Sequence, residues 1–123
     1  MNVEMKHIPH NNAYHIHFNY IDPPTQLKVI AFSEVFTNKQ DAENAVKLVK
    51  LVKQFDDIIA NPDARLSLTL EVKCVYHNWY ILCTCWHTHR KRSIAKDTIL
   101  FTTETAAWIA IDVIKTMRSL KSS

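Results

Sequence analysis

The chain has 123 residues, of which 47% are hydrophobic and 22% charged, and its formal net charge is +3. These proportions are ordinary for one soluble globular domain, and no apolar stretch approaches the roughly 20 residues that a membrane helix needs. Glycine is absent, which excludes the glycine-rich loops that hold phosphate in P-loop and dinucleotide-binding proteins.

Charge is distributed unevenly between the two halves of the chain. Residues 1–61 carry six lysines and seven acidic residues, a net charge of −1, whereas residues 62–123 carry nine basic and five acidic residues, a net charge of +4. An anionic partner would therefore favour the second half. The three cysteines form no recognisable disulfide framework, and the first residues lack the apolar core of a signal peptide. We expect a cytoplasmic protein.

Six segments alternate between apolar and polar side chains, which is the period of strands that bury one face. Three of them lie in each half of the chain, and a longer helical pattern follows each group of three. Pro23-Pro24 places a loop between the second and third segments, and His77-Asn78 turns the chain between the fourth and fifth. The predicted strands are Asn2–His7, Tyr14–Ile21, Leu27–Phe32, Arg65–Tyr76, Trp79–His89 and Ser93–Leu100.

Both helical patterns repeat apolar residues at a spacing of three or four, which predicts that one face of each helix covers a sheet. A capping box of Thr37 and Gln40 should begin the first helix, and Asn61-Pro62 should end it. Thr102 or Thr103 should cap the second helix. We expect the broad apolar surfaces to contact each other or a second subunit. The apolar stripes are Ala42, Ala45, Val46, Val49 and Val52 in the first helix and Ala107, Ala110, Ile111, Ile114 and Met117 in the second.

Without glycine, the turns need other residues that tolerate left-handed backbone dihedrals. Asparagine adopts these dihedrals more readily than most residues, because its short side chain can bond to the local backbone. We therefore predict left-handed conformations at Asn12, Asn38, Asn61 and Asn78.

The segment 36–53 returns 65 positions later as the segment 101–118. The two read FTNKQDAENAVKLVKLVK and FTTETAAWIAIDVIKTMR and share five of 18 residues without a gap. The predicted strands follow the same offset, so the repeat indicates a duplicated structural unit. We predict an α+β protein of two tandem βββα units, residues 1–61 and 62–123. They should pack as one compact domain, with antiparallel sheets that carry the helices on one face.

The stretch Ser33–Lys50, SEVFTNKQDAENAVKLVK, resembles the repeat of the YegP-like family of small bacterial proteins. That repeat has a Ser-Glu-x-aromatic stretch, a lysine, Ala-Glu-Asn, a small residue and an apolar helix that ends near Val-Lys. The resemblance implies a fold of tandem βββα units and implies no particular activity. The matching residues are Ser33, Glu34, Phe36, Lys39, Ala42, Glu43, Asn44, Val49 and Lys50.

Cys83, Cys85, His87 and His89 occupy every second position of one predicted strand, so they point to one face. Cysteine and histidine are the usual ligands of structural zinc. However, the repeat aligns both cysteines with aromatic residues on the apolar face of the first unit. Four successive positions on one face also span roughly 20 Å, which is too far for one ion. We expect these cysteines and Cys74 to lie in the core, and we expect no metal and no cofactor.

The run His87–Arg92, HTHRKR, is the densest positive patch and is predicted to form a hairpin tip. Aromatic and apolar residues precede it on the outer face of the strand. Basic residues beside exposed aromatic rings are typical of proteins that bind single-stranded nucleic acid. Alternatively, this face packs against the other unit or a second subunit, and the loop is merely solvated. The nucleic-acid candidates are His87, His89, Arg90, Lys91, Arg92 and Lys73, and the outer-face residues are Tyr80, Leu82, Thr84 and Trp86.

Trp108 lies among polar residues of the second helix, at the position where the first helix has Glu43. A tryptophan there is either half covered by a loop or an anchor for a partner, since tryptophan is enriched at interface centres. The partner-binding candidates are Trp108, Trp86, Tyr80 and Leu82.

No catalytic motif is present, so we nominate no catalytic residue and do not expect an enzyme. The leading expectation is a non-enzymatic binding module that acts by protein–protein contact, as a small regulator or a phage-type inhibitor would. Its partner would be another protein or a second copy of itself in a homodimer, and not a membrane. The first alternative is a nucleic-acid-binding protein that uses the outer strand face and basic hairpin of the second unit. The second alternative is a structural zinc-binding protein.

Overall fold

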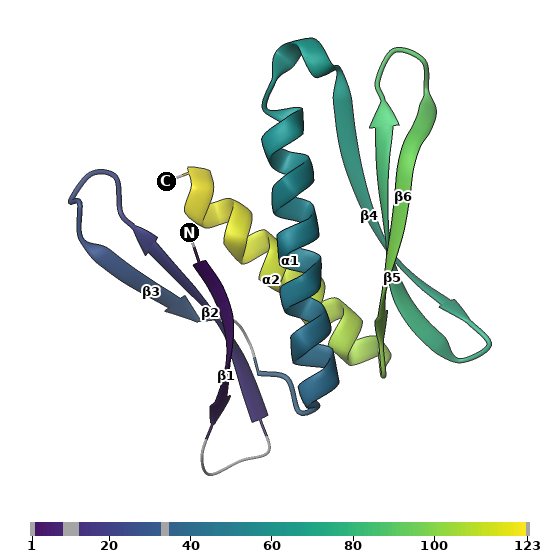
Figure 1. Cartoon of the computed structure of the whole chain (residues 1–123). Helices are drawn as coiled ribbons and strands as arrows, with labels where there is room; N and C mark the ends of the chain where they lie inside the picture. Colours follow the sequence, from purple (N-terminus) through teal and green to yellow (C-terminus); the bar gives the residue numbers. More distant parts are fainter. Residues whose placement is uncertain (1, 9–12, 33–34, 123) are drawn as a thin grey trace.

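The computed structural model describes residues 2–8, 13–32 and 35–122 and confirms an α+β fold of two βββα-like units (Figure 1). Neither helix in this part of the chain has the length and apolar character to cross a membrane. The first unit comprises β1 (Asn2–Ile8), β2 (Ala13–Ile21), β3 (Lys28–Phe32) and α1 (Lys39–Ile59). After a short 3-10 helix, η1 (Pro62–Ala64), the second unit comprises β4 (Leu66–Val75), β5 (Asn78–His87), β6 (Arg92–Phe101) and α2 (Glu104–Ser122).

Each unit forms one antiparallel sheet, in the orders β1-β2-β3 and β4-β5-β6. The two helices lie between the sheets (Figure 1). Helix α1 packs against both sheets and against α2, and α2 also packs against the second sheet. We call the helix-facing side of each sheet its inner face. The outer face of the second sheet therefore faces away from both helices.

The 65-residue offset holds for the folded elements as well as for the residues. Helices α1 and α2 begin at residues 39 and 104, and the central strands β2 and β5 begin at residues 13 and 78. The bridge between Tyr14 and Phe36 returns as the pair Trp79 and Phe101. The buried helical positions also match one for one. They are Asp41, Ala42, Ala45, Leu48, Val49 and Val52 in α1 and Ala106, Ala107, Ala110, Val113, Ile114 and Met117 in α2.

Both units contribute to one hydrophobic cluster. Ile16 and Phe18 of β2 and Ile81 and Cys83 of β5 are fully buried in it, and the apolar helical positions above also belong to it. The prediction that Cys83 and Cys85 are buried is therefore confirmed. The same prediction is wrong for Cys74, which is exposed. The turn of the β4–β5 hairpin extends away from the helices (Figure 1), and Cys74 lies close to this turn.

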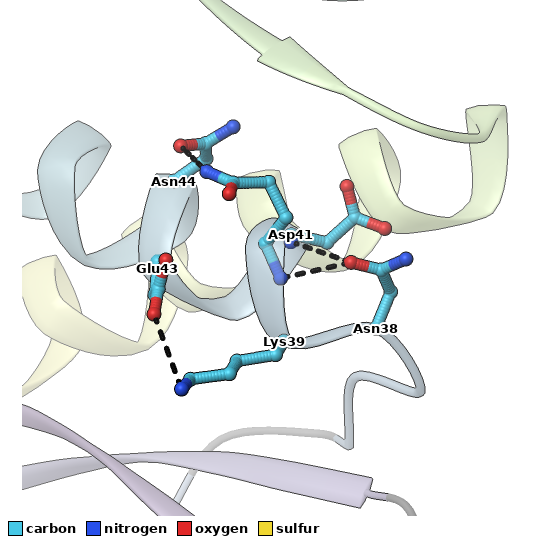
Figure 2. A network of polar contacts seen from close by, with 6 residues as sticks. Asn38, Lys39, Asp41, Glu43 and Asn44 are labelled. Atoms are coloured by element: carbon cyan, nitrogen blue, oxygen red, sulfur yellow. Dashed lines mark hydrogen bonds and ion pairs between the residues drawn. The ribbon is translucent and has the colours of Figure 1, made fainter.

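Helix α1 begins one residue later than the sequence predicts. Its N-cap is Asn38, whose side-chain oxygen accepts hydrogen bonds from the backbone N–H groups of Gln40 (2.8 Å) and Asp41 (3.3 Å) (Figure 2). The predicted capping box of Thr37 and Gln40 is therefore wrong. The prediction for α2 is confirmed at Thr103, whose hydroxyl accepts a hydrogen bond from the N–H of Ala106 at 3.1 Å.

The prediction of left-handed asparagines is also wrong for the three that the structure describes. Asn38 and Asn61 have φ values of −124° and −77° and serve as N-caps, so their side chains bond to amides ahead of them. Asn78 is the first residue of β5 and has no positive φ, and Asn12 lies outside the described residues. The left-handed positions in the described ranges are instead Gln26, Arg65, Tyr76, His77 and Lys91.

Candidate binding surface on the second sheet

Strand β5 presents a different chemistry on each face. Ile81, Cys83 and Cys85 are buried against the helices on the inner face. Because side chains alternate along a strand, Tyr80, Leu82, Thr84 and Trp86 point to the outer face, which no helix covers. The structure therefore places Tyr80, Leu82 and Trp86 on one surface, as the sequence predicts.

Trp86 is fixed in place along this outer face. Its indole N–H donates a hydrogen bond to the hydroxyl of Thr69 at 2.8 Å. Thr69 is the direct cross-strand partner of Thr84, so the indole reaches back over Thr84. Thr84 is only 2% exposed as a result, although it lies on the open side of the sheet. Trp86 is itself partly buried.

At the other end of the outer face, three large apolar side chains adjoin. Leu100 on β6 is paired directly with Tyr80, and Leu82 lies two positions further along β5. Leu100 is 61% exposed, whereas Tyr80 and Leu82 are partly buried by their neighbours. We call these three residues the outer patch.

The predicted basic hairpin is confirmed and includes one residue that the sequence did not suggest. The backbone N–H and the hydroxyl of Thr88 both donate to the carbonyl oxygen of Arg65 at 2.9 Å. Arg65, which has a φ of 53° and immediately precedes β4, is thus held beside the hairpin. The strand register could have revealed that Arg65 joins this site, because pairing Leu66 of β4 with His87 of β5 puts Arg65 beside Thr88. The basic end of the sheet comprises the side chains of Arg65, Arg90, Lys91 and Arg92.

The ring of His87 is held in place at this end of the sheet. Its Nδ1 accepts a hydrogen bond from the backbone N–H of Arg90 at 3.1 Å, and its carbonyl accepts one from Lys91 at 2.9 Å. Burial lowers the pKa of His87, and the nearby charges of Arg90, His89, Arg92 and Arg65 lower this pKa further. No side chain of the basic end forms an ion pair with a carboxylate in the described part of the chain. No carboxylate of the described residues therefore neutralises the positive charge there.

A surface hollow connects Trp86 with the basic end. Its volume is about 440 Å³, within the range of about 300–1,000 Å³ that is typical of small-ligand sites. The hollow brings an aromatic ring, three hydroxyl groups, an imidazole and an ammonium group to one place. The lining residues are Ser67, Thr69, Trp86, His87, Thr88 and Lys91.

Lys73 does not belong to the basic end, although the sequence groups them. It lies opposite Tyr80, about 20 Å along the strand from the position of Trp86. Its ammonium group is 3.1 Å from the carboxylate of Glu71. The hydrogen bond and the charge of Glu71 raise the pKa of Lys73. Lys73 thus flanks the outer patch as half of an ion pair.

Trp108 is separate from the other aromatic candidates. It is 51% exposed, and its indole N–H donates a long hydrogen bond of 3.4 Å to Glu104 one turn earlier in α2. In α1 the same two positions hold an ion pair of 4.0 Å between Lys39 and Glu43 (Figure 2). Helix α2 packs on the inner side of the second sheet, so Trp108 and the outer patch do not share a surface.

The residues proposed for zinc do not converge. The rings of His87 and His89 are 6.3 Å apart at their centres, and Cys83 is fully buried. Burial, and then the charge of Asp97, raise the pKa of Cys83 to about 12, which opposes the thiolate form that binds metal. Across the described ranges, no three His, Cys, Asp or Glu side chains gather at a spacing suited to an ion.

Comparison with protein-family models, with curated proteins and with solved structures finds no match to this chain. The similarity of Ser33–Lys50 to the YegP-like repeat therefore stays a prediction.

Proposed function

We propose that the protein is a non-enzymatic binding module that acts by protein–protein contact through the outer patch. The observation that supports this proposal is the position of Leu100, which is 61% exposed beside Tyr80 on a sheet face that no helix covers. Large apolar and aromatic side chains that lie together on a surface are characteristic of the core of an interface. The partner that fits the patch is a second copy of the chain.

The charges around the patch are self-complementary. Glu71 and Lys73 lie side by side on β4, and Lys96 lies on the same face of β6, opposite Thr84. A two-fold axis through the patch places the same residues on both sides of the interface. In that arrangement a carboxylate of one copy can face an ammonium group of the other copy.

The size of the face sets the strength of this association. Strands β4, β5 and β6 have ten residues each, so the face measures roughly 33 Å by 14 Å. Two such faces packed together bury roughly 900 Å² in total, which is below the range of stable interfaces and within that of weak, transient ones. Antiparallel stacking also keeps the two basic ends apart. We therefore expect a weak homodimer that forms with a dissociation constant of roughly 10–100 µM.

Sedimentation equilibrium from about 5 to 500 µM tests the proposal, because this range spans the expected dissociation constant. The wild-type chain should pass from monomer to dimer, and Leu100→Asp should stay a monomer because it buries a charge at the interface. Ile30→Asp is the matched control, since Ile30 is 54% exposed on the outer face of the first sheet. A monomer throughout, or a dimer that Ile30→Asp abolishes and Leu100→Asp leaves intact, contradicts the proposal.

A further inference from the structure

We propose that the basic end and Trp86 form a binding site for single-stranded nucleic acid. The arginines and the lysine would contact successive phosphates, and the indole would stack against one base. This inference concerns a different part of the outer face from the outer patch, and it does not depend on self-association.

The charge at this site selects an anion. Arg65, Arg90, Lys91 and Arg92 come from the start of β4 and from the β5–β6 hairpin, and the hydrogen bonds from Thr88 to Arg65 hold these two segments together. None of the four is neutralised by a carboxylate of the described residues. A chain with regularly spaced charges can bind all four at once, whereas a single small anion cannot.

The indole ring of Trp86 favours a nucleic acid over other polyanions, because a nucleic acid also carries bases that can stack on it. The bond to Thr69 and the buried Thr84 behind it hold the indole along the sheet, and the ring lines the hollow together with Lys91. A ring that is already fixed loses little side-chain entropy when a base stacks on it. Stacking on an aromatic ring beside a basic groove is the usual way of binding single strands without strong sequence preference.

The geometry favours a single strand over a duplex. In a duplex the bases stack on each other and present only their edges, so they offer no face to an indole that lies along the sheet. Phosphates at the basic end and a base over Trp86 require an unpaired strand.

Fluorescence anisotropy with labelled oligothymidylate and oligouridylate of about 12 nucleotides provides the test. We expect dissociation constants of about 1–100 µM near physiological salt. With four phosphate contacts, the slope of log affinity against log salt should be about −3, because each contact on a single strand contributes about −0.7. Preference for one of the two strands would report a contact to the sugar or the base, and binding of either strand supports the site.

Two double variants test whether binding depends on the basic end itself or only on the net charge of the protein. Arg90→Gln with Arg92→Gln should weaken binding roughly 25-fold at about 0.1 M salt and reduce the salt slope by about 1.4. These positions are chosen because Lys91 has a φ of 50°, which substitution would disturb. Lys47→Gln with Lys50→Gln removes the same charge from the exposed face of α1 and should change affinity less than about twofold.

The stacking contact has its own variants. Trp86→Leu should weaken binding by roughly 5- to 150-fold, whereas Trp86→Phe, which keeps an aromatic ring, should retain most of the affinity. Trp108→Leu, on the far side of the sheet, should have no effect. Several results would overturn the proposal: no binding at about 1 mM strand in low salt, equal binding of oligoglutamate, tighter binding of a duplex, or unchanged affinity in folded Trp86→Leu.

Discussion

The carboxylate of Asp41 accepts hydrogen bonds from both the backbone N–H (2.8 Å) and the hydroxyl of Thr102, 61 residues further along the chain. Asp41 lies in the first turn of α1 and is only 3% exposed. Thr102 lies between β6 and α2, so this contact joins the first helix to the start of the second. The amide of Asn44 makes a second link by donating to the carbonyl of Leu100 at 2.8 Å.

Replacing Asp41 with alanine should destabilise the fold by about 1–3 kcal/mol, because the two hydrogen bonds that Thr102 donates to this buried carboxylate are lost. Urea unfolding would measure the loss. Asp112→Ala, at an exposed position of α2, is the control and should change stability by less than about 0.5 kcal/mol. In a double-mutant cycle, Asp41→Ala and Thr102→Val should couple strongly; additive losses would show that the contact contributes little.

The β4–β5 turn offers a stabilising change. Tyr76 and His77 have φ values of 50° and 66°, which is the pattern of a two-residue turn that favours Asn-Gly. Each left-handed residue other than glycine costs about 1 kcal/mol. Replacing the pair by Asn-Gly should therefore raise the free energy of unfolding by about 1 kcal/mol.

Thermal unfolding would detect this change as a higher midpoint. Asn78→Gly is the neighbouring control, since Asn78 has no positive φ and gains nothing from glycine. If the Asn-Gly replacement lowered the midpoint as Asn78→Gly does, the left-handed dihedrals of Tyr76 and His77 would not be a source of strain.

Thiol labelling should distinguish the three cysteines. Cys74 is exposed, whereas Cys83 is fully buried and its pKa is raised to about 12, first by burial and then by Asp97. Burial also raises the pKa of Cys85. Native protein should therefore react quickly at Cys74 alone, because the thiolate is the reactive form. Mass spectrometry should find one label in the native state and three in denaturant. Fast labelling of Cys83 would contradict its position in the core.

Stability should fall on mild acidification. Burial, followed by the charges of His15 and Lys6, lowers the pKa of His17, and burial and four cationic neighbours lower the pKa of His87. Both histidines bind protons near pH 6.5 in the unfolded chain. Below that pH the unfolded state therefore binds more protons than the folded state, so stability that is complete above 6.5 is lost as the pH falls toward the folded pKa values.

Urea unfolding at about pH 5 and pH 7.5 would measure the difference, since these values bracket the histidine titration. The midpoint should be lower at the acid pH, and His17→Gln with His87→Gln should reduce the gap. An equal midpoint at both values would show that neither histidine resists protonation in the fold.

The repeat made much of the architecture predictable. Because α1 and α2 begin 65 residues apart and bury the same positions, the alignment of two short segments was sufficient to predict both units. It also predicted that Cys83 lies in the core, since its counterpart is Phe18. Alternation and helical periodicity are local properties of the chain, and so they can be read without coordinates.

The candidate site was predicted less completely. The sequence grouped Lys73 with HTHRKR because both are basic, yet Lys73 pairs with Glu71 at the other end of the sheet. It overlooked Arg65, which meets the hairpin only through the register of β4 and β5. Contacts of this kind depend on how strands are paired, and composition does not report pairing.

By itself, the sequence determined the two βββα units, the inner and outer faces of their strands and the buried stripes of their helices, because these follow from short-range periodicity. Only the tertiary structure decided which residues each side chain contacts and how far it is exposed. It left Cys74 exposed at a projecting strand end and buried Thr84 beneath Trp86 on an open face. It also joined Asp41 to Thr102 and gathered four cations around one hairpin. These outcomes depend on contacts between residues far apart in the chain, which form only when the sheets and helices pack.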